Sequence, residues 1–396
     1  MRRLLLPLFA LLLITTSCLE EIDTKATLKI KISAPQGNIA VEGLDLTEIE
    51  VKLQNKSNAF SYSNHLDNNG EVTFVVQPGK YDVLASAQYN TGVSVNASKS
   101  EFLLTEDGII GDDGSVNVAE ISLELNVNIP NPLIIREIYY QGSSTLEGKS
   151  YTKDRYIEIY NNGLITQYLD SICVTTVYPY NSTTGSNSWA DKDTIPAAGM
   201  VWMIPGNGTQ YPLAPGESCV LAYCAVDHTQ RATSGLNLAK AHFGFYEDGL
   251  TGHEIAAGVP PLIRIIAGLG SAWSFSISSP AVVIFRPEMG VANYLANAAT
   301  WELFEPGKTS GTKYWHIAKE WILDGVECVQ SAAKSVKRLP TSVDASYIYM
   351  NSASYSGKVV TRKVKDIING NEVFQDTNNS AEDFISDQVP SPRLKN

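Results

Sequence analysis

The sequence predicts an all-β protein of two antiparallel β-sandwich domains, immunoglobulin-like in type, with long loop insertions in the second. Apolar and polar residues alternate with a period of two through much of the chain, as in residues 28–32 and 121–129. Turn-forming residues separate these segments, notably at 67–70 and 77–80. No helical period occurs between them, and short strands separated by turns are typical of sandwiches.

The first residues have the layout of a secretory signal that ends in a lipidated cysteine. Two arginines and the apolar run 4–14 are followed by small residues and then Cys18. The run is about half as long as a membrane-spanning helix requires. We therefore expect residues 1–17 to be removed, Cys18 to carry the lipid and residues 18–25 to form an acidic tether. The alternative is a soluble secreted protein in which Cys18 merely falls near the cleavage site.

The acidic residues after Cys18 resemble the signal that sends Bacteroidota lipoproteins to the cell surface. The resemblance implies an outer-membrane protein, anchored by lipid, that faces the cell exterior.

The net charge of the chain bears on whether it binds nucleic acid. Removing residues 1–17 deletes two arginines and no acidic residue, so the formal charge of -12 becomes -12 - 2 = -14. Such an excess without a basic block argues against nucleic-acid binding.

Residues 26–128 form the predicted front sandwich. Residues 67–74 read Asp-Asn-Asn-Gly-Glu-Val-Thr-Phe, and residues 77–83 read Gln-Pro-Gly-Lys-Tyr-Asp-Val. This turn-and-strand pattern resembles the small carboxypeptidase-regulatory or transthyretin-like sandwiches. The resemblance implies a fold and no ligand.

The domain boundary is predicted at Pro130 and Pro132, because two prolines so close together interrupt a β-ladder. The second domain, residues 132–396, opens with the stretches 133–140 and 154–162. These resemble the first strands of lamin-tail immunoglobulin-like domains, and later stretches follow in the same order. The combination resembles uncharacterised Bacteroidota surface lipoproteins. That family implies a fold and a location but no reaction.

The second domain is longer than a compact lamin-tail module, and its extra length lies in loops 177–193 and 228–279. Long insertions often carry function. The insertion 228–254 holds a group of residues that are able to bind metal: His228, His242, Glu247, Asp248, His253 and Glu254. A metal-dependent hydrolase using this insertion is the alternative function. However, His253-Glu254 does not continue into the zinc-protease motif, so we expect no metal or other cofactor.

Glu137 and Glu158 fall on neighbouring predicted strands and are the only paired carboxylates suited to acid–base chemistry. Both positions are Glu in the lamin-tail-like pattern, so we expect structural hydrogen bonds instead.

Four cysteines remain besides Cys18: Cys173, Cys219, Cys224 and Cys328. Buried thiols and disulfides are both open, although Cys219 and Cys224 fall on opposite strand faces and should not pair with each other.

Aromatic residues are the remaining binding candidates. Tyr178, Tyr180 and Trp189 lie in a loop rich in Asn, Ser, Thr and Gly, where exposed rings suit stacking on sugars or contact with a partner. Trp301, Trp315 and Trp321 have apolar neighbours at near-helical spacing, which predicts the core of a short helical excursion.

Taken together, the sequence features favour a lipid-anchored cell-surface binding or scaffolding protein, an accessory of an outer-membrane nutrient-uptake system. Its expected partner is an outer-membrane transporter or a glycan.

Overall fold

The computed structural model describes residues 24–35, 44–58, 60–88, 94–128, 130–183, 187–189, 192–268 and 273–395. The predicted signal peptide and Cys18 therefore lie outside the described residues. Within them the protein is almost entirely β, which confirms the predicted fold class. No described helix is long and apolar enough to cross a membrane.

The first sandwich has two sheets, in the orders β4-β1-β9 and β3-β2-β5-β6-β7-β8, with β10 paired to β6. Its elements are β1 (Ala26–Ser33), η1 (Leu46–Glu48), β2 (Glu50–Asn55), β3 (Ser61–His65), β4 (Glu71–Val76), β5 (Gly79–Gln88), β6 (Ser94–Leu104), β7 (Ile109–Ile110), β8 (Val116–Asn117), β9 (Glu120–Glu124) and β10 (Asn126–Asn128). The alternating apolar residues of both sheets form one core that extends from Ala26 to Val127.

Not every strand pair is antiparallel as predicted. β9 runs parallel to β1, with Ile30 opposite Ile121. The chain reaches β9 after passing through the other sheet, so it enters beside β1 instead of returning through a hairpin.

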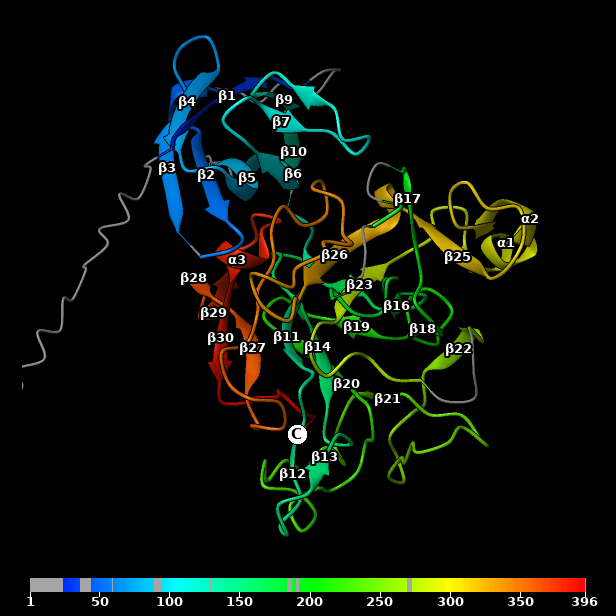
Figure 1. The fold of residues 1–396 in the computed structure, drawn as a ribbon. Coiled ribbons are helices and arrows are strands. Elements are labelled where there is room, and N and C mark those ends of the chain that lie inside the picture. The colour runs from blue at the N-terminus through cyan, green and yellow to red at the C-terminus, as the bar shows by residue number, and fades with distance from the viewer. Residues whose placement is uncertain are drawn as a thin grey trace, which may run out of the picture.

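Two sheets, of six and five strands, enclose the core of the second part (Figure 1). One has the order β21-β20-β14-β11-β27-β30 and the other β22-β18-β16-β23-β26. Their strands are β11 (Leu133–Tyr139), β14 (Tyr156–Asn161), β16 (Cys173–Thr176), β18 (Val201–Met203), β20 (Ser218–Ala222), β21 (Phe243–Gly244), β22 (Ile263–Ile266), β23 (Ala281–Phe285), β26 (Ile322–Glu327), β27 (Val359–Arg362) and β30 (Phe384–Gln388).

β11 and β14 are buried on both faces. Ile157 and Ile159 point into the main core, whereas Tyr156 and Tyr160 belong to smaller clusters on the opposite face. That second face is covered by loops and by the C-terminal segment, so polar residues of these strands are also buried.

Short elements complete the fold: β12 (Ser143–Ser144), β13 (Ser150–Tyr151), β15 (Gln167–Tyr168), β17 (Thr194–Pro196), β19 (Pro212–Leu213), α1 (Val291–Ala296), α2 (Ala298–Trp301), β24 (Glu302–Phe304), β25 (Lys313–Ala318), η2 (Lys319–Trp321), β28 (Val364–Ile368), β29 (Asn371–Phe374) and α3 (Ser380–Asp383). The predicted helical excursion is present as α1 and α2, but Trp315 lies in strand β25. Tyr294 explains the clustering of the tryptophans, because its ring lies 5.7 Å from Trp301, 5.4 Å from Trp315 and 5.5 Å from Trp321.

The two sandwiches contact each other through polar groups. The first lies over the end of the second that carries α3 (Figure 1). Ser94 donates a hydrogen bond of 3.1 Å to the carbonyl of Thr377, and the hydroxyls of Ser98 and Thr341 lie 2.7 Å apart. The predicted boundary at Pro130 and Pro132 lies between the residues of the two main cores. Whether each part folds alone stays a prediction.

Candidate ligand-binding cleft

A cleft of about 310 Å³ lies between the two sandwiches. Strands β2, β3, β5 and β6 of the first form one wall, and loops of the second form the other. The residues that line it are Lys52, Gln54, Ser61, Asp82, Val83, Leu84, Ser100, Ala332, Lys337, Ala345, Ser346, Tyr347, Tyr349, Asn379, Ala381 and Glu382. This volume is at the lower end of the range for small-ligand sites.

The strand period places polar residues on the cleft wall. Along β2, Val51 and Leu53 are buried in the core of the first sandwich, while Lys52 and Gln54 face outward. An antiparallel sheet with one polar face normally exposes that face to solvent. Here the second sandwich covers that face, so the polar residues become the wall of a cleft.

Ion pairs hold the cleft walls in place. Lys52 lies 3.4 Å from Glu382 across the cleft, and their side chains are 40% and 31% exposed. Lys56 is buried, lies 3.1 Å from Asp82 and sits 5.2 Å from the centre of the Tyr347 ring. Tyr347 in turn donates a hydrogen bond of 3.2 Å to Asp82. Burial and the neighbouring Asp82 carboxylate raise the pKa of the Tyr347 hydroxyl, so it remains a hydrogen-bond donor at neutral pH.

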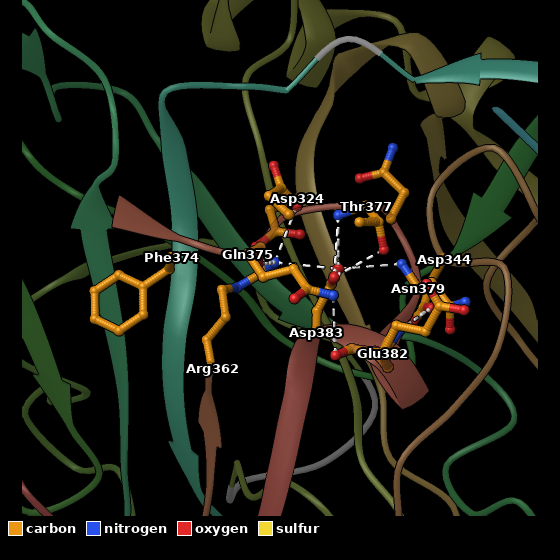
Figure 2. A network of polar contacts seen from close by, with 12 residues as sticks. Asp324, Asp344, Arg362, Phe374, Gln375, Thr377, Asn379, Glu382 and Asp383 are labelled. Carbon is orange, nitrogen blue, oxygen red and sulfur yellow. Dashed lines mark hydrogen bonds and ion pairs between the residues drawn. The ribbon is translucent and has the colours of Figure 1, made fainter. Parts of the chain in front are cut away.

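The loop that precedes α3 brings Asn379 to the cleft, and α3 itself brings Glu382. Figure 2 shows how the carboxylate of Asp383 organises this loop. It accepts hydrogen bonds from the backbone of Thr377 at 2.9 Å and of Asn379 at 3.2 Å. On the other side of the loop, Asp344 accepts a hydrogen bond of 2.8 Å from the backbone of Ser380. Both carboxylates are buried, so the loop is fixed from within the protein.

Arg362 anchors the same network from β27. Its guanidinium lies 2.6 Å from Asp324 and 3.4 Å from Asp383 (Figure 2). It also lies 2.9 Å from Asp376. Burial raises the pKa of the Asp383 carboxyl, and Arg362 opposes that rise. Removing one partner of such a buried group leaves an uncompensated charge, which is strongly destabilising. We therefore assign this network to holding the cleft wall and not to chemistry.

Asn379 has an unpaired donor at the cleft. The residue is only 1% exposed, and its side-chain oxygen accepts a hydrogen bond of 3.2 Å from the backbone of Ala381. Its amide nitrogen has no hydrogen-bond partner among the described residues. A buried donor without a partner costs about 1–3 kcal/mol, and such a group calls for an unplaced water or ligand.

The aromatic loop predicted from the sequence lies elsewhere, beside β25. Tyr178 packs on Tyr314 with a ring separation of 4.4 Å. Trp189 is only 4% exposed and packs at 4.4 Å on the ring of His316. Tyr180 is 40% exposed. Of these three candidates only Tyr180 presents an open ring, and none of them lines the cleft.

The histidines of the insertion 228–254 do not meet. His228 hydrogen bonds with Tyr151 at 2.8 Å and with the carbonyl of Cys224 at 3.0 Å. Both ring nitrogens of His253 face backbone carbonyls, at 3.1 and 3.0 Å, while a ring nitrogen of His242 accepts a hydrogen bond of 3.1 Å from a backbone amide. Among the described residues, no group of three or more His, Cys, Asp or Glu is placed to hold a metal ion.

Glu137 and Glu158 lie opposite each other on β11 and β14, and both are fully buried. Arg136 contacts the two carboxylates at 3.5 and 2.9 Å. Ser218 donates a hydrogen bond of 2.6 Å to Glu158, and Ser391 donates one of 2.9 Å from its backbone to Glu137. All these partners belong to the protein itself, as the structural interpretation of the pair predicts.

Each of Cys173, Cys219, Cys224 and Cys328 is a buried free thiol. Burial in apolar surroundings raises the pKa of each thiol, to about 11 in Cys224. The question that the sequence left open is therefore answered in favour of thiols.

The sequence reasoning missed the cleft residues. Residue 82 appeared only within the turn-and-strand pattern of residues 77–83, and Lys52 and Asn379 were not singled out. The alternating pattern gave a usable signal, because it showed which face of β2 is polar. It gave no information on which loops of the second sandwich cover that face.

The geometry defines an all-β protein of two sandwiches with a cleft between them that charged, amide and aromatic side chains line. Residues 214–391 match the model of a family described as "Protein of unknown function (DUF4876)". The structure is also similar to the crystal structure of a DUF4876 family protein from Bacteroides thetaiotaomicron VPI-5482. That similarity has a TM-score of 0.60 and 28% sequence identity, over 93% of this chain and 96% of that chain. No curated protein matches this chain. Together the matches support an uncharacterised family with members in the Bacteroidota, and they carry no information on function.

Proposed function

We propose that this chain is a lipid-anchored cell-surface binding protein that takes a small hydroxyl-rich ligand, a saccharide, in the cleft between its sandwiches. The observation that carries the proposal is the unpaired amide of Asn379, buried at the edge of a cleft of about 310 Å³. The front sandwich is proposed to be of the carboxypeptidase-regulatory type and the second of the lamin-tail type.

The lining of the cleft favours a neutral polar ligand. Its formal charges balance, because Lys52 and Lys337 oppose Asp82 and Glu382. Amide, hydroxyl and carboxylate groups supply donors and acceptors of fixed direction. The half-buried rings of Tyr347 and Tyr349 add apolar surface for the C–H faces of a sugar.

The proposal also includes lipid anchoring at Cys18 and a role as an accessory of an outer-membrane nutrient-uptake system. Both rest on the sequence of the first residues and on the resemblance to surface lipoproteins. The competing proposal, a metal-dependent hydrolase, has less support, because the histidines it needs bond to Tyr151 and to the backbone instead of facing one another.

The test uses the purified full chain with Cys18→Ala, screened on a glycan array and then titrated by calorimetry with each glycan that binds. Asn379→Ala removes the amide donor at the cleft, together with the hydrogen bond from the Ala381 backbone, and should weaken binding about 3- to 10-fold. Tyr349→Ala should weaken it further. Tyr180→Ala, which removes an exposed ring outside the cleft, is the matched control. Binding that survives both cleft variants unchanged would exclude the cleft, and no glycan binding at all would refute the saccharide.

A further inference from the structure

Residues 389–395 form a segment that lies outside every strand and crosses the outer face of β11 and β14. The segment follows β30, and Val389 at its start is 72% exposed. From Ser391 onward it makes specific contacts with the body of the protein. It can therefore leave this face without breaking any pairing between strands.

Contacts to the backbone of the segment recur at alternate residues. The backbone N–H of Ser391 donates to Glu137 at 2.9 Å, that of Arg393 to Glu158 at 3.4 Å and that of Lys395 to the carbonyl of Lys240 at 3.1 Å. Arg136 donates hydrogen bonds of 3.1 and 2.9 Å to the carbonyl and hydroxyl of Ser391. Backbone bonds at every second residue are the way in which proteins hold an extended peptide.

The side chains of the segment enter separate subsites. The guanidinium of Arg393 lies 5.3 Å above the ring of Tyr160 and 5.7 Å from that of Phe374, and it pairs with Glu372. Leu394 packs against the apolar cluster on the outer face of the sheet. The ammonium of Lys395 donates to the carbonyl of His242 at 3.3 Å.

Charge complementarity supports recognition. The face beneath the segment presents three acidic side chains, those of Glu137, Glu158 and Glu372, against the single guanidinium of Arg136. The segment brings two cations, Arg393 and Lys395, and no acidic residue. Without it the two fully buried glutamates would keep Arg136 as their only cationic partner among the described residues.

We propose that the outer face of β11 and β14 is a peptide-recognition groove for an extended basic segment of the type Ser-Pro-Arg-Leu, and that residues 391–395 of the chain itself occupy it. The groove is distinct from the cleft between the sandwiches. Occupation by the tethered segment masks it, because a tethered peptide acts at an effective concentration in the millimolar range. A peptide of the same chemistry gains access only when this segment is released.

The experiment uses the full chain with a protease recognition sequence inserted between Gln388 and Val389, both of which are exposed. After cleavage, the severed segment should remain bound through size-exclusion chromatography. It should then exchange with a fluorescent synthetic peptide of residues 389–396, which the uncut chain should not bind. A competitor peptide with Arg393→Ala should be at least 10-fold weaker, whereas one with Val389→Ala should compete equally.

Two results would overturn the proposal. One is loss of the severed segment from a folded protein that then binds no peptide, or that binds both variant peptides equally well. The other is unfolding on cleavage, detected by circular dichroism, because it would show the segment to be part of the structural core instead of a ligand.

Discussion

Glu137 and Glu158 face each other across the β11–β14 pair, fully buried, with Arg136 as their shared cationic partner. Burial raises the pKa of Glu158 to about 7, and Arg136 and Ser218 oppose the rise. A carboxyl group that keeps its proton so near neutrality makes the folding stability depend on pH.

The first prediction follows from that shift. In the unfolded chain the Glu158 carboxyl ionises near 4.5, whereas in the folded protein it ionises near 7, so between these values the folded state binds more protons. Its stabilising contribution is complete below about pH 4.5 and is lost as the pH rises through about 7. One pKa unit is worth 1.36 kcal/mol, so the stability of the wild type relative to Glu158→Gln should fall by on the order of 3 kcal/mol over this range.

Urea denaturation of both proteins at a series of pH values measures this difference. Glu288→Gln, at an exposed position, is the control and should show no such trend. A difference between wild type and Glu158→Gln that stays flat, or that grows with pH, contradicts the assignment.

The second prediction concerns the aromatic loop. Trp189 is buried against His316, whereas Tyr180 is 40% exposed. Replacing a buried tryptophan by alanine removes its packing and leaves a cavity, so Trp189→Ala should reduce the free energy of unfolding by about 3–5 kcal/mol. Tyr180→Ala should change it by about 0.5 kcal/mol or less. Equal, small effects from chemical denaturation would show that Trp189 is not a core residue.

Trp189 also shows where sequence reasoning reaches its limit. Its neighbours along the chain are small and polar, which favoured an exposed ring, but the surface that buries it comes from β25, far away in the sequence. Alternation is a local property and predicted the strands and their inner faces, such as Leu28 and Ile30 in β1. The cleft depends on contacts between distant segments, as between Lys52 and Glu382, and no local pattern encodes these.

The third prediction concerns the thiols. Cys173, Cys219, Cys224 and Cys328 are all buried and unpaired. Because the thiolate is the reactive form and burial disfavours it, iodoacetamide should not label these residues in the folded protein. In denaturant without reductant, all of them should react, as measured by mass spectrometry on the Cys18→Ala chain. Labelling that requires a reductant would instead reveal disulfides.

The fourth prediction concerns the anchor. If Cys18 carries the lipid, Cys18→Ala should abolish acyl labelling and move the protein from the membrane fraction to the soluble fraction. Acylation supplies the membrane affinity in this proposal, since each buried CH₂ group contributes about 0.8 kcal/mol. Ser17→Ala, which keeps a small residue before the cysteine, is the matched control and should remain in the membrane. Retention of the Cys18→Ala protein in the membrane would refute lipid anchoring at this residue.

The last prediction concerns the boundary at Pro130 and Pro132. The apolar core of the first sandwich draws only on residues 26–127, and that of the second begins at Leu133. The interface between them is polar, with Lys52 paired to Glu382 and Ser94 bonded to the carbonyl of Thr377. Polar contacts of this kind contribute little when solvent replaces them, whereas a shared apolar core would be lost on separation.

Residues 24–128 and 131–396, expressed separately, should therefore each melt cooperatively with a β-type circular dichroism spectrum. The cleft needs both walls, so glycan binding should be absent from each piece alone. A front piece that does not fold would show that the two sandwiches stabilise each other through this interface, and a piece that binds the glycan alone would place the site outside the cleft.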